Sequence, residues 1–128
     1  MGSRCRFVAE VLAETPTRDI HIACGATDMR KSIDGLAALV QLTFELNPFS
    51  EAWFVFCNKE RNKIKLLRWD HNGFWLYYRR LERGRFQWPR SPDALTQTIT
   101  HRQLLWLLDG LNLEQKRAHK AVSARECV

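Results

Sequence analysis

Basic and aromatic side chains alternate between residues 59 and 90, and there the sequence gathers most of its candidate functional groups. The only acids in this stretch are Glu60, Asp70 and Glu82, whereas its cations are Lys59, Arg61, Lys63, Lys65, Arg68, Arg79, Arg80, Arg83, Arg85 and Arg90. Cations of this kind neutralise phosphates and release counterions, and exposed Trp or Tyr rings stack on bases. The pattern favours nucleic acid as a partner.

A second basic pair, Arg30 and Lys31, lies in the glycine-led loop that begins at Gly25. Both residues precede a predicted helix, whose N-terminus would favour a phosphate. The alternative is purely structural, because Thr27, Asp28 or Ser32 could cap that helix. The full set of candidate nucleic-acid-binding residues is Arg30, Lys31, Lys63, Lys65, Arg68, Arg79, Arg80, Arg83 and Arg85.

The aromatic residues of the same stretch also have two interpretations. Trp75 and Tyr77 are the candidates for base stacking. The purely structural alternative is that these rings are part of the hydrophobic core, while Lys and Arg protect edge strands from aggregation.

The carboxylates do not form a convincing catalytic set. A metal-dependent nuclease needs clustered Asp and Glu to hold its two metal ions. The available acids are scattered, namely Asp28, Asp34, Asp70, Glu82, Asp93 and Asp109. A recombinase using Tyr77, Tyr78 or Ser32 would rest on neighbouring arginines alone. We therefore predict no catalytic residues and no cofactor.

Cysteine usage argues against a metal site. The sequence has four cysteines, Cys5, Cys24, Cys57 and Cys127, with no Cys-x-x-Cys pair, and His21 with Cys24 forms only half of a site. Neither a signal peptide nor an apolar run of the ~20 residues that a membrane span requires is visible. We expect a cytoplasmic protein with free thiols, no metal and no membrane partner.

Composition agrees with a single globular domain. The chain has 128 residues, a net charge of +6 and a pI near 9.5, which favours an acidic partner. We expect an N-terminal extension over residues 1–18 with the apolar spacing of a helix, one α+β domain over 19–113, and a basic C-terminal tail over 114–128.

The strands that must position these groups are expected at 53–57, 64–69, 74–78 and, shorter, 85–88, after a short strand within 19–24. These runs are rich in aromatic and β-branched residues, and the turn Asn72-Gly73 should place both residues at positive φ. The fold class is therefore predicted as an antiparallel β-meander of four or five strands packed with two main helices.

The first helix should run from Ile33 to Leu46 and end at Asn47-Pro48, with Gly35 indicating close packing. The second follows a capping box formed by Thr100 and Gln103, and Gly110 lies near its end. Its leucines predict a broad apolar face.

Three long motifs carry a family resemblance: GATDMRKSIDGLAALV at 25–40, IKLLRWD at 64–70 and YRRLERGRFQWP at 78–89. From Ile20 to Leu113 the chain resembles the TnpB accessory protein of the insertion-sequence-66 family of bacterial transposons, which is distinct from the RNA-guided nuclease of the same name. The resemblance implies a small protein encoded beside the transposase, needed for efficient transposition and without an established catalytic activity.

The function predicted from residues and resemblance together is that of a non-catalytic accessory factor for DNA transposition and recombination of a mobile element. It would bind the transposon ends, or the transposase–DNA complex, through basic hairpins. Two alternatives stay open: a module that docks the transposase without touching DNA, and a small metal-dependent nuclease. The sequence leaves the oligomeric state open.

Overall fold

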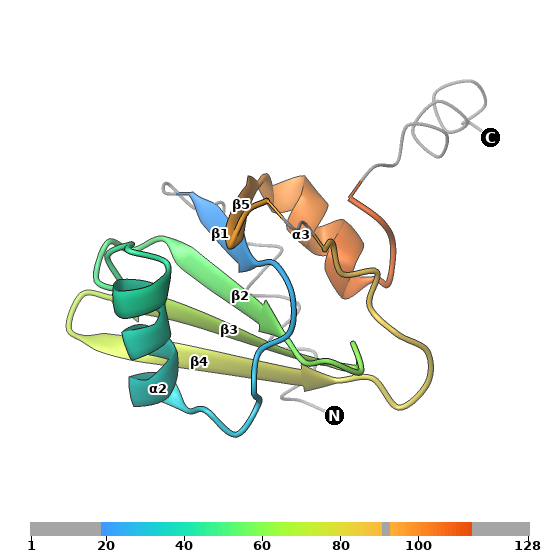
Figure 1. Cartoon of the computed structure of the whole chain (residues 1–128), viewed down its shortest axis with the longest axis horizontal. Helices are drawn as coiled ribbons and strands as arrows, with labels where there is room; N and C mark the ends of the chain where they lie inside the picture. Colours follow the sequence, from blue (N-terminus) through green and yellow to red (C-terminus); the bar gives the residue numbers. More distant parts are fainter. Residues whose placement is uncertain (1–18, 91–92, 114–128) are drawn as a thin grey trace.

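The computed structural model describes residues 19–90 and 93–113, which form one five-stranded sheet with helices on both faces (Figure 1). The strand order is β4-β3-β2-β1-β5. The elements in chain order are β1 (Ile20–Ala23), α2 (Ile33–Ala38), η1 (Leu39–Thr43), β2 (Trp53–Cys57), β3 (Lys63–Asp70), β4 (Gly73–Arg80), β5 (Thr96–Ile99) and α3 (His101–Leu108). The predicted N-terminal helix and basic tail lie outside the described residues.

The sheet confirms the α+β prediction and is mostly antiparallel. Strands β2, β3 and β4 form the predicted meander, and β5 pairs antiparallel with β1. Strand β1 instead runs parallel to β2, because the helix between them carries the chain back to the starting edge. The single parallel pair thus follows from the position of α2 in the chain.

The two faces of the sheet have separate hydrophobic clusters. On the face that we call the α3 face, Val55, Ile64 and Leu66 pack with Leu104 and Leu107 of α3. On the opposite α2 face, Phe54, Phe56 and Leu67 pack with Leu36 of α2 and Val40 of η1. Because successive side chains of a strand point to opposite faces, this assignment fixes the side on which every other residue of β3 and β4 lies.

The predicted strand at 85–88 is wrong. Phe86 and Trp88 are buried and Gln87 is exposed, so the alternation typical of a strand is present, but the segment is irregular. It crosses the α3 face, where Phe86 N–H donates to the Arg61 carbonyl and Trp88 Nε1 donates to the Ala23 carbonyl at 2.8 Å. Its place as a further strand is taken by β5, whose largely β-branched run of four residues is too short to stand out in the sequence.

The predicted turn between β3 and β4 is displaced by one residue. Asp70 pairs with Gly73 in the ladder, so the two-residue loop is His71-Asn72 and Gly73 begins β4. His71 has φ of 63°, whereas neither Asn72 nor Gly73 has a positive φ. A single positive φ at His71 does not fit the type I′ turn that an Asn-Gly pair predicts, because that turn has two residues at positive φ. The two neighbours of His71 are joined by a hydrogen bond from Asn72 N–H to the Asp70 carbonyl.

The first helix starts at Ile33 as expected but ends before Leu46. Regular α-helix stops at Ala38, and a π-helical turn follows to Thr43, closed by a hydrogen bond from Phe44 N–H to the Leu39 carbonyl. Glu45 then has φ of 56°, which ends the helix ahead of Asn47-Pro48. A Cβ at Gly35 would lie 3.2 Å from Cβ of Lys31, in line with the close packing expected there.

Helix α3 has the predicted capping box at its N-terminus. Thr100 Oγ1 accepts from Gln103 N–H at 3.1 Å, and the Gln103 side chain accepts from Thr100 N–H at 2.9 Å. At the other end Gly110 has φ of 83°, its N–H donates to the Leu107 carbonyl and Leu111 N–H donates to the Trp106 carbonyl. These two bonds form a Schellman motif, so both ends of the helix are closed by local hydrogen bonds.

Candidate nucleic-acid interface

The alternation of β3 and β4 divides the candidate cations between the two faces of the sheet. Lys63 pairs with Arg80 and Lys65 with Tyr78, and these four residues lie on the α2 face. Arg68 pairs with Trp75, and with Arg79 and Tyr77 it belongs to the α3 face. The hairpin therefore presents a different set of cations and rings on each face.

On the α2 face a groove of about 610 Å³ opens between a loop, a turn and strands β3 and β4. We call it the basic groove. Its cations come from the loop before α2, from the turn between β2 and β3, and from β3, and they are Arg30, Lys59, Lys63 and Lys65. Leu76 and Tyr78 of β4 also line it, and Asp28 and Glu60 are the acids among its lining residues. Segments that are distant in the sequence thus form one cationic depression.

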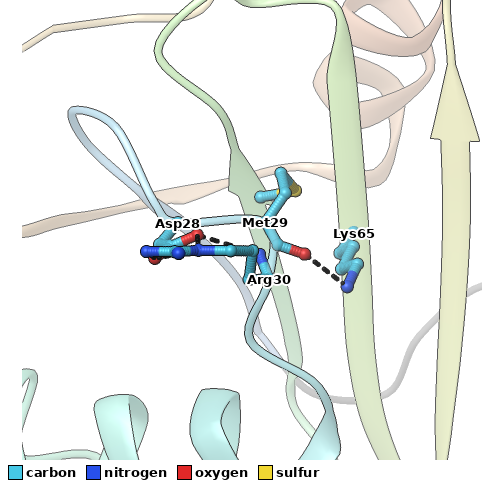
Figure 2. A network of polar contacts seen from close by, with 4 residues as sticks. All are labelled: Asp28, Met29, Arg30 and Lys65. Atoms are coloured by element: carbon cyan, nitrogen blue, oxygen red, sulfur yellow. Dashed lines mark hydrogen bonds and ion pairs between the residues drawn. The ribbon is translucent and has the colours of Figure 1, made fainter.

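Lys65 holds one wall of the groove in place. Its Nζ donates to the carbonyl oxygen of Met29 at 2.8 Å (Figure 2). It also donates to the carbonyl oxygen of Lys31 at 2.8 Å and lies 5.7 Å from the centre of the Tyr78 ring. An ammonium has three donors, so one remains after these two bonds. Lys65 joins the 27–31 loop to the sheet and leaves little of its hydrogen-bonding capacity for a ligand.

Arg30 is held by Asp28 at the rim of the groove. The guanidinium donates to both carboxylate oxygens, with Nη2 2.8 Å from Oδ2, and its side chain is 92% exposed (Figure 2). The side-chain hydrogen bond from Arg30 lowers the pKa of Asp28 to about 2. Asp28 therefore organises the loop, and the expectation that a side chain caps α2 is wrong, because Ser32 at the N-cap makes no such bond.

The turn that contributes Lys59 and Lys63 is ordered by Asn58. The Asn58 side chain is buried, and its Oδ1 accepts from the N–H groups of Asn62 and Lys63, both at 3.0 Å. Arg61 takes φ of 62° within this turn. Lys59 also lines the groove, although the set of site residues predicted from the sequence omits it. The only feature of the sequence that pointed to Lys59 was its place in a stretch rich in cations.

Lys31 and the cations after β4 lie outside the residues that line the groove. Lys31 contributes its carbonyl to Lys65, and its side chain lies against Gly35. Arg80 pairs with Glu82, whose Oε2 lies 3.0 Å from Nη2. Arg83 and Arg85 are exposed in the bend that follows β4.

On the α3 face, Trp75 and Tyr77 form a parallel pair that we call the aromatic strip. Their ring centres are 6.2 Å apart and their planes differ by 9°. Trp75 is 52% exposed, and its Nε1 donates to Asp70 Oδ2 at 3.2 Å. Tyr77 is partly buried against the α3-face cluster. Arg68, whose guanidinium lies 5.5 Å from the Trp53 ring centre, approaches the same Asp70 oxygen at 3.9 Å.

Within residues 19–90 and 93–113, no three His, Cys, Asp or Glu side chains come together in a way that could hold a metal ion. In the same residues, no helix has the length and apolar character needed to cross a membrane. Burial raises the pKa of the Cys57 thiol to about 12, which leaves it in the neutral form inside the core.

These features define a small α+β protein with a basic groove on one face of a five-stranded sheet. Residues 18–118 match the family described as IS66 Orf2-like protein, and the chain belongs to that family. The family resemblance inferred from the motifs is thereby confirmed, and it gives the chain a transposition-associated role as an accessory protein of IS66 insertion sequences.

Two curated relatives come from Sinorhizobium fredii and are themselves uncharacterised. The protein y4hO is 39% identical over 93 residues, which are 73% of this chain and 80% of the relative. The protein y4jC is 32% identical over 81 residues, or 62% of this chain and 69% of the relative. No solved structure matches the chain.

Proposed function

We propose that the protein acts in transposition by binding DNA through the basic groove, with phosphates of the transposon ends as its ligand. The observation that carries the proposal is the convergence onto one groove of Arg30, from the loop before α2, and of Lys59 and Lys63, from the turn that ends at the start of β3. Clustered cations on a chain of net charge +6 release counterions when they meet a polyanion.

The groove is also pre-ordered for this task. Lys65 fixes the loop that carries Arg30, and Asn58 fixes the turn that carries Lys59 and Lys63. Side chains on a fixed backbone lose less conformational freedom on binding than those on a mobile loop. Because phosphate contacts carry no base information, the groove would position the protein on DNA without selecting a sequence, and the transposase would supply sequence choice.

Titration of the full chain against a labelled transposon-end duplex over a range of salt concentrations tests the groove. Changing Arg30 or Lys63 to Ala should each lower the salt slope by about one unit and weaken an unrelated duplex equally. Arg102→Ala, at an exposed position of α3, is the matched control and should leave the slope unchanged. Unaltered slopes in both groove variants would refute the proposal.

An aromatic cluster with one exposed ring supports a second candidate, docking of the transposase without DNA contact. Phe49 is 51% exposed, and its ring centre lies 5.0 Å from the partly buried Trp69 and 5.4 Å from the partly buried Phe74 on the α2 face. Aromatic residues are enriched at protein interfaces, where such a ring could be an anchor. If Phe49→Ala abolishes capture of the transposase while the protein fails to bind any DNA at low salt, this candidate replaces the groove.

Catalysis is not part of the proposal. The acids Asp28, Asp70 and Glu82 are each engaged with an arginine of the hairpin or loop, in pairs that structure the backbone around them. Incubation with magnesium or manganese should leave transposon-end DNA neither nicked nor joined. Metal-dependent cleavage that disappears in Asp28→Asn or Asp70→Asn would instead establish a nuclease.

A further inference from the structure

We infer that the aromatic strip on the α3 face binds unpaired bases, so that the ligand of this protein includes a single-stranded segment of DNA. The inference rests on the proposed DNA binding and adds strandedness to it. It concerns a surface separate from the basic groove, because Trp75 and Tyr77 lie on the opposite face of β4 from Tyr78.

The strip lies on an edge strand and is accessible. Strand β4 ends the sheet order, so beyond it no further strand is paired within the described chain. Trp75 is 52% exposed, whereas Leu104, Leu107 and Leu108 of α3 are buried over the cluster formed with β1, β2 and β3. A single half-exposed Trp is not unusual in itself; what distinguishes this one is the parallel Tyr77 ring beside it.

A polar chain of contacts fixes the indole. Trp75 Nε1 donates to Asp70, and Arg68 lies beside the same carboxylate while its guanidinium packs over Trp53. The second ring of the strip is parallel to the first within 9°. Two parallel, immobilised rings present a ready stacking surface, because little side-chain freedom remains to be lost when a base arrives.

The geometry of the strip selects unpaired bases. In a duplex each base is already stacked about 3.4 Å from its neighbours along the strand, so a ring attached to a sheet has no access to a base face. Bases that are unstacked can lie on Trp or Tyr rings regardless of sequence. Alternate residues of a strand are about 6.6 Å apart, so Trp75 and Tyr77 offer neighbouring platforms to successive bases.

Charge complementarity favours a nucleic acid over an apolar protein surface. Arg79 is the next residue on the same face; its Nε is buried and has no hydrogen-bond partner among the described residues, so the guanidinium keeps its full charge beside the strip. Arg83 and Arg85 follow in the exposed bend. The strip thus lies beside cations along the same edge, so a strand whose bases stack on the rings could place its phosphates near these cations.

The test compares single-stranded and duplex binding of the full chain at low salt. The probes are a labelled oligothymidylate of about 16 nucleotides, within the site sizes of single-strand binders, and a duplex of similar length. Trp75→Ala should weaken oligothymidylate binding about 5- to 150-fold, the equivalent of ~1–3 kcal/mol, and change duplex binding less than twofold. Trp75→Phe keeps a ring and should retain most of the affinity.

Leu42→Ala, at a 75% exposed position of η1, is the apolar control and should leave oligothymidylate binding unchanged. Equal losses for both probes, or no loss in Trp75→Ala, would overturn the inference. If Trp75→Ala fails to fold, photo-crosslinking of the unaltered protein to bromouracil-substituted oligothymidylate decides: crosslinks at Trp75 or Tyr77 support the strip, and crosslinks confined to the groove overturn it.

The two proposals fail in different ways. If Lys63→Ala abolishes duplex binding and Trp75→Ala leaves oligothymidylate binding unchanged, the groove proposal stands and the strip inference is refuted. If oligothymidylate binding depends on Trp75 and the protein does not bind duplex at all, the strip inference stands and the groove proposal is refuted.

Discussion

The ammonium of Lys65 lies 2.8 Å from the carbonyl oxygen of Met29, although the two residues are 36 positions apart in the chain. A lysine in a basic hairpin would ordinarily be assigned to a phosphate. Here its main contacts are inside the protein, so its effect on DNA binding should be indirect, through the loop that carries Arg30.

Replacing Lys65 by Met should therefore destabilise the domain, by about 1.5–3 kcal/mol, because charged hydrogen bonds are lost and carbonyls are left unsatisfied. Lys63→Met, its neighbour on the same face, should change stability by less than about 0.5 kcal/mol. Urea unfolding of both variants measures the difference. Equal midpoints for the two would contradict a structural role for Lys65.

Arg30 sets the ionisation of Asp28. Because the folded pKa is about 2, below the ordinary 3.8, the interaction is fully present above about pH 4 and is lost as the pH falls through about 2. Arg30→Gln should return the Asp28 midpoint toward its ordinary value, as followed by NMR titration of the carboxyl carbon. A midpoint that stays near 2 in this variant would show that another group holds the carboxylate.

Because the turn is displaced by one residue, the position that is sensitive to a β-branched substitution should be His71 and not Gly73. Gly73 begins β4 without a positive φ, and a Cβ added there meets no atom within 4 Å. Gly73→Thr should consequently be neutral or mildly stabilising. His71→Val should destabilise by about 1–2 kcal/mol, because a β-branched residue resists φ near 63°. Chemical unfolding of both variants checks the assignment, and the reverse ranking would restore the Asn72-Gly73 turn.

His21 gives the domain a pH dependence in the mildly acidic range. Burial lowers its pKa from 6.5, an effect partly offset by Asp19, and its ring stacks on Phe54 at 5.4 Å. The unfolded chain then binds a proton that the folded chain resists, so stability is greatest above about pH 6.5 and decreases as the pH falls below it. The free energy of unfolding of the native protein should therefore fall more steeply on acidification than that of His21→Gln, so the difference between the two becomes smaller at low pH. Unfolding curves at pH 7 and pH 5.5 test this, and a constant difference would exclude the effect.

The meander and the second helix could be predicted because their signals are local. Strand β2 spans Trp53–Cys57 as expected, since a run of large apolar residues needs burial on both faces. The capping box of α3 depends only on Thr100 and Gln103, three residues apart. Local propensity and the global fold agree at these places.

The misassigned segments depend on partners far away in the chain. Residues 85–88 alternate like a strand, yet they do not pair with the edge of β4; the segment instead crosses the α3 face, where Phe86 and Trp88 join the hydrophobic cluster. The basic groove is likewise a long-range product, because Arg30 reaches Lys63 only after β1, α2 and β2 are in place. Charge content alone predicted one basic surface. The alternation of side chains along β3 and β4 instead divides these cations between the two faces of the sheet.

That alternation restricts how the length of β4 can vary among related chains. Inserting one residue between Gly73 and Tyr78 would exchange the faces of every side chain beyond it, placing Tyr78 opposite Ile64 on the α3 face and Arg79 opposite Lys63 at the groove. An insertion of two residues would preserve the faces, and insertions in the segment between β4 and β5 would not disturb them. Length changes in the family should accordingly accumulate outside β4 or occur within it in even numbers.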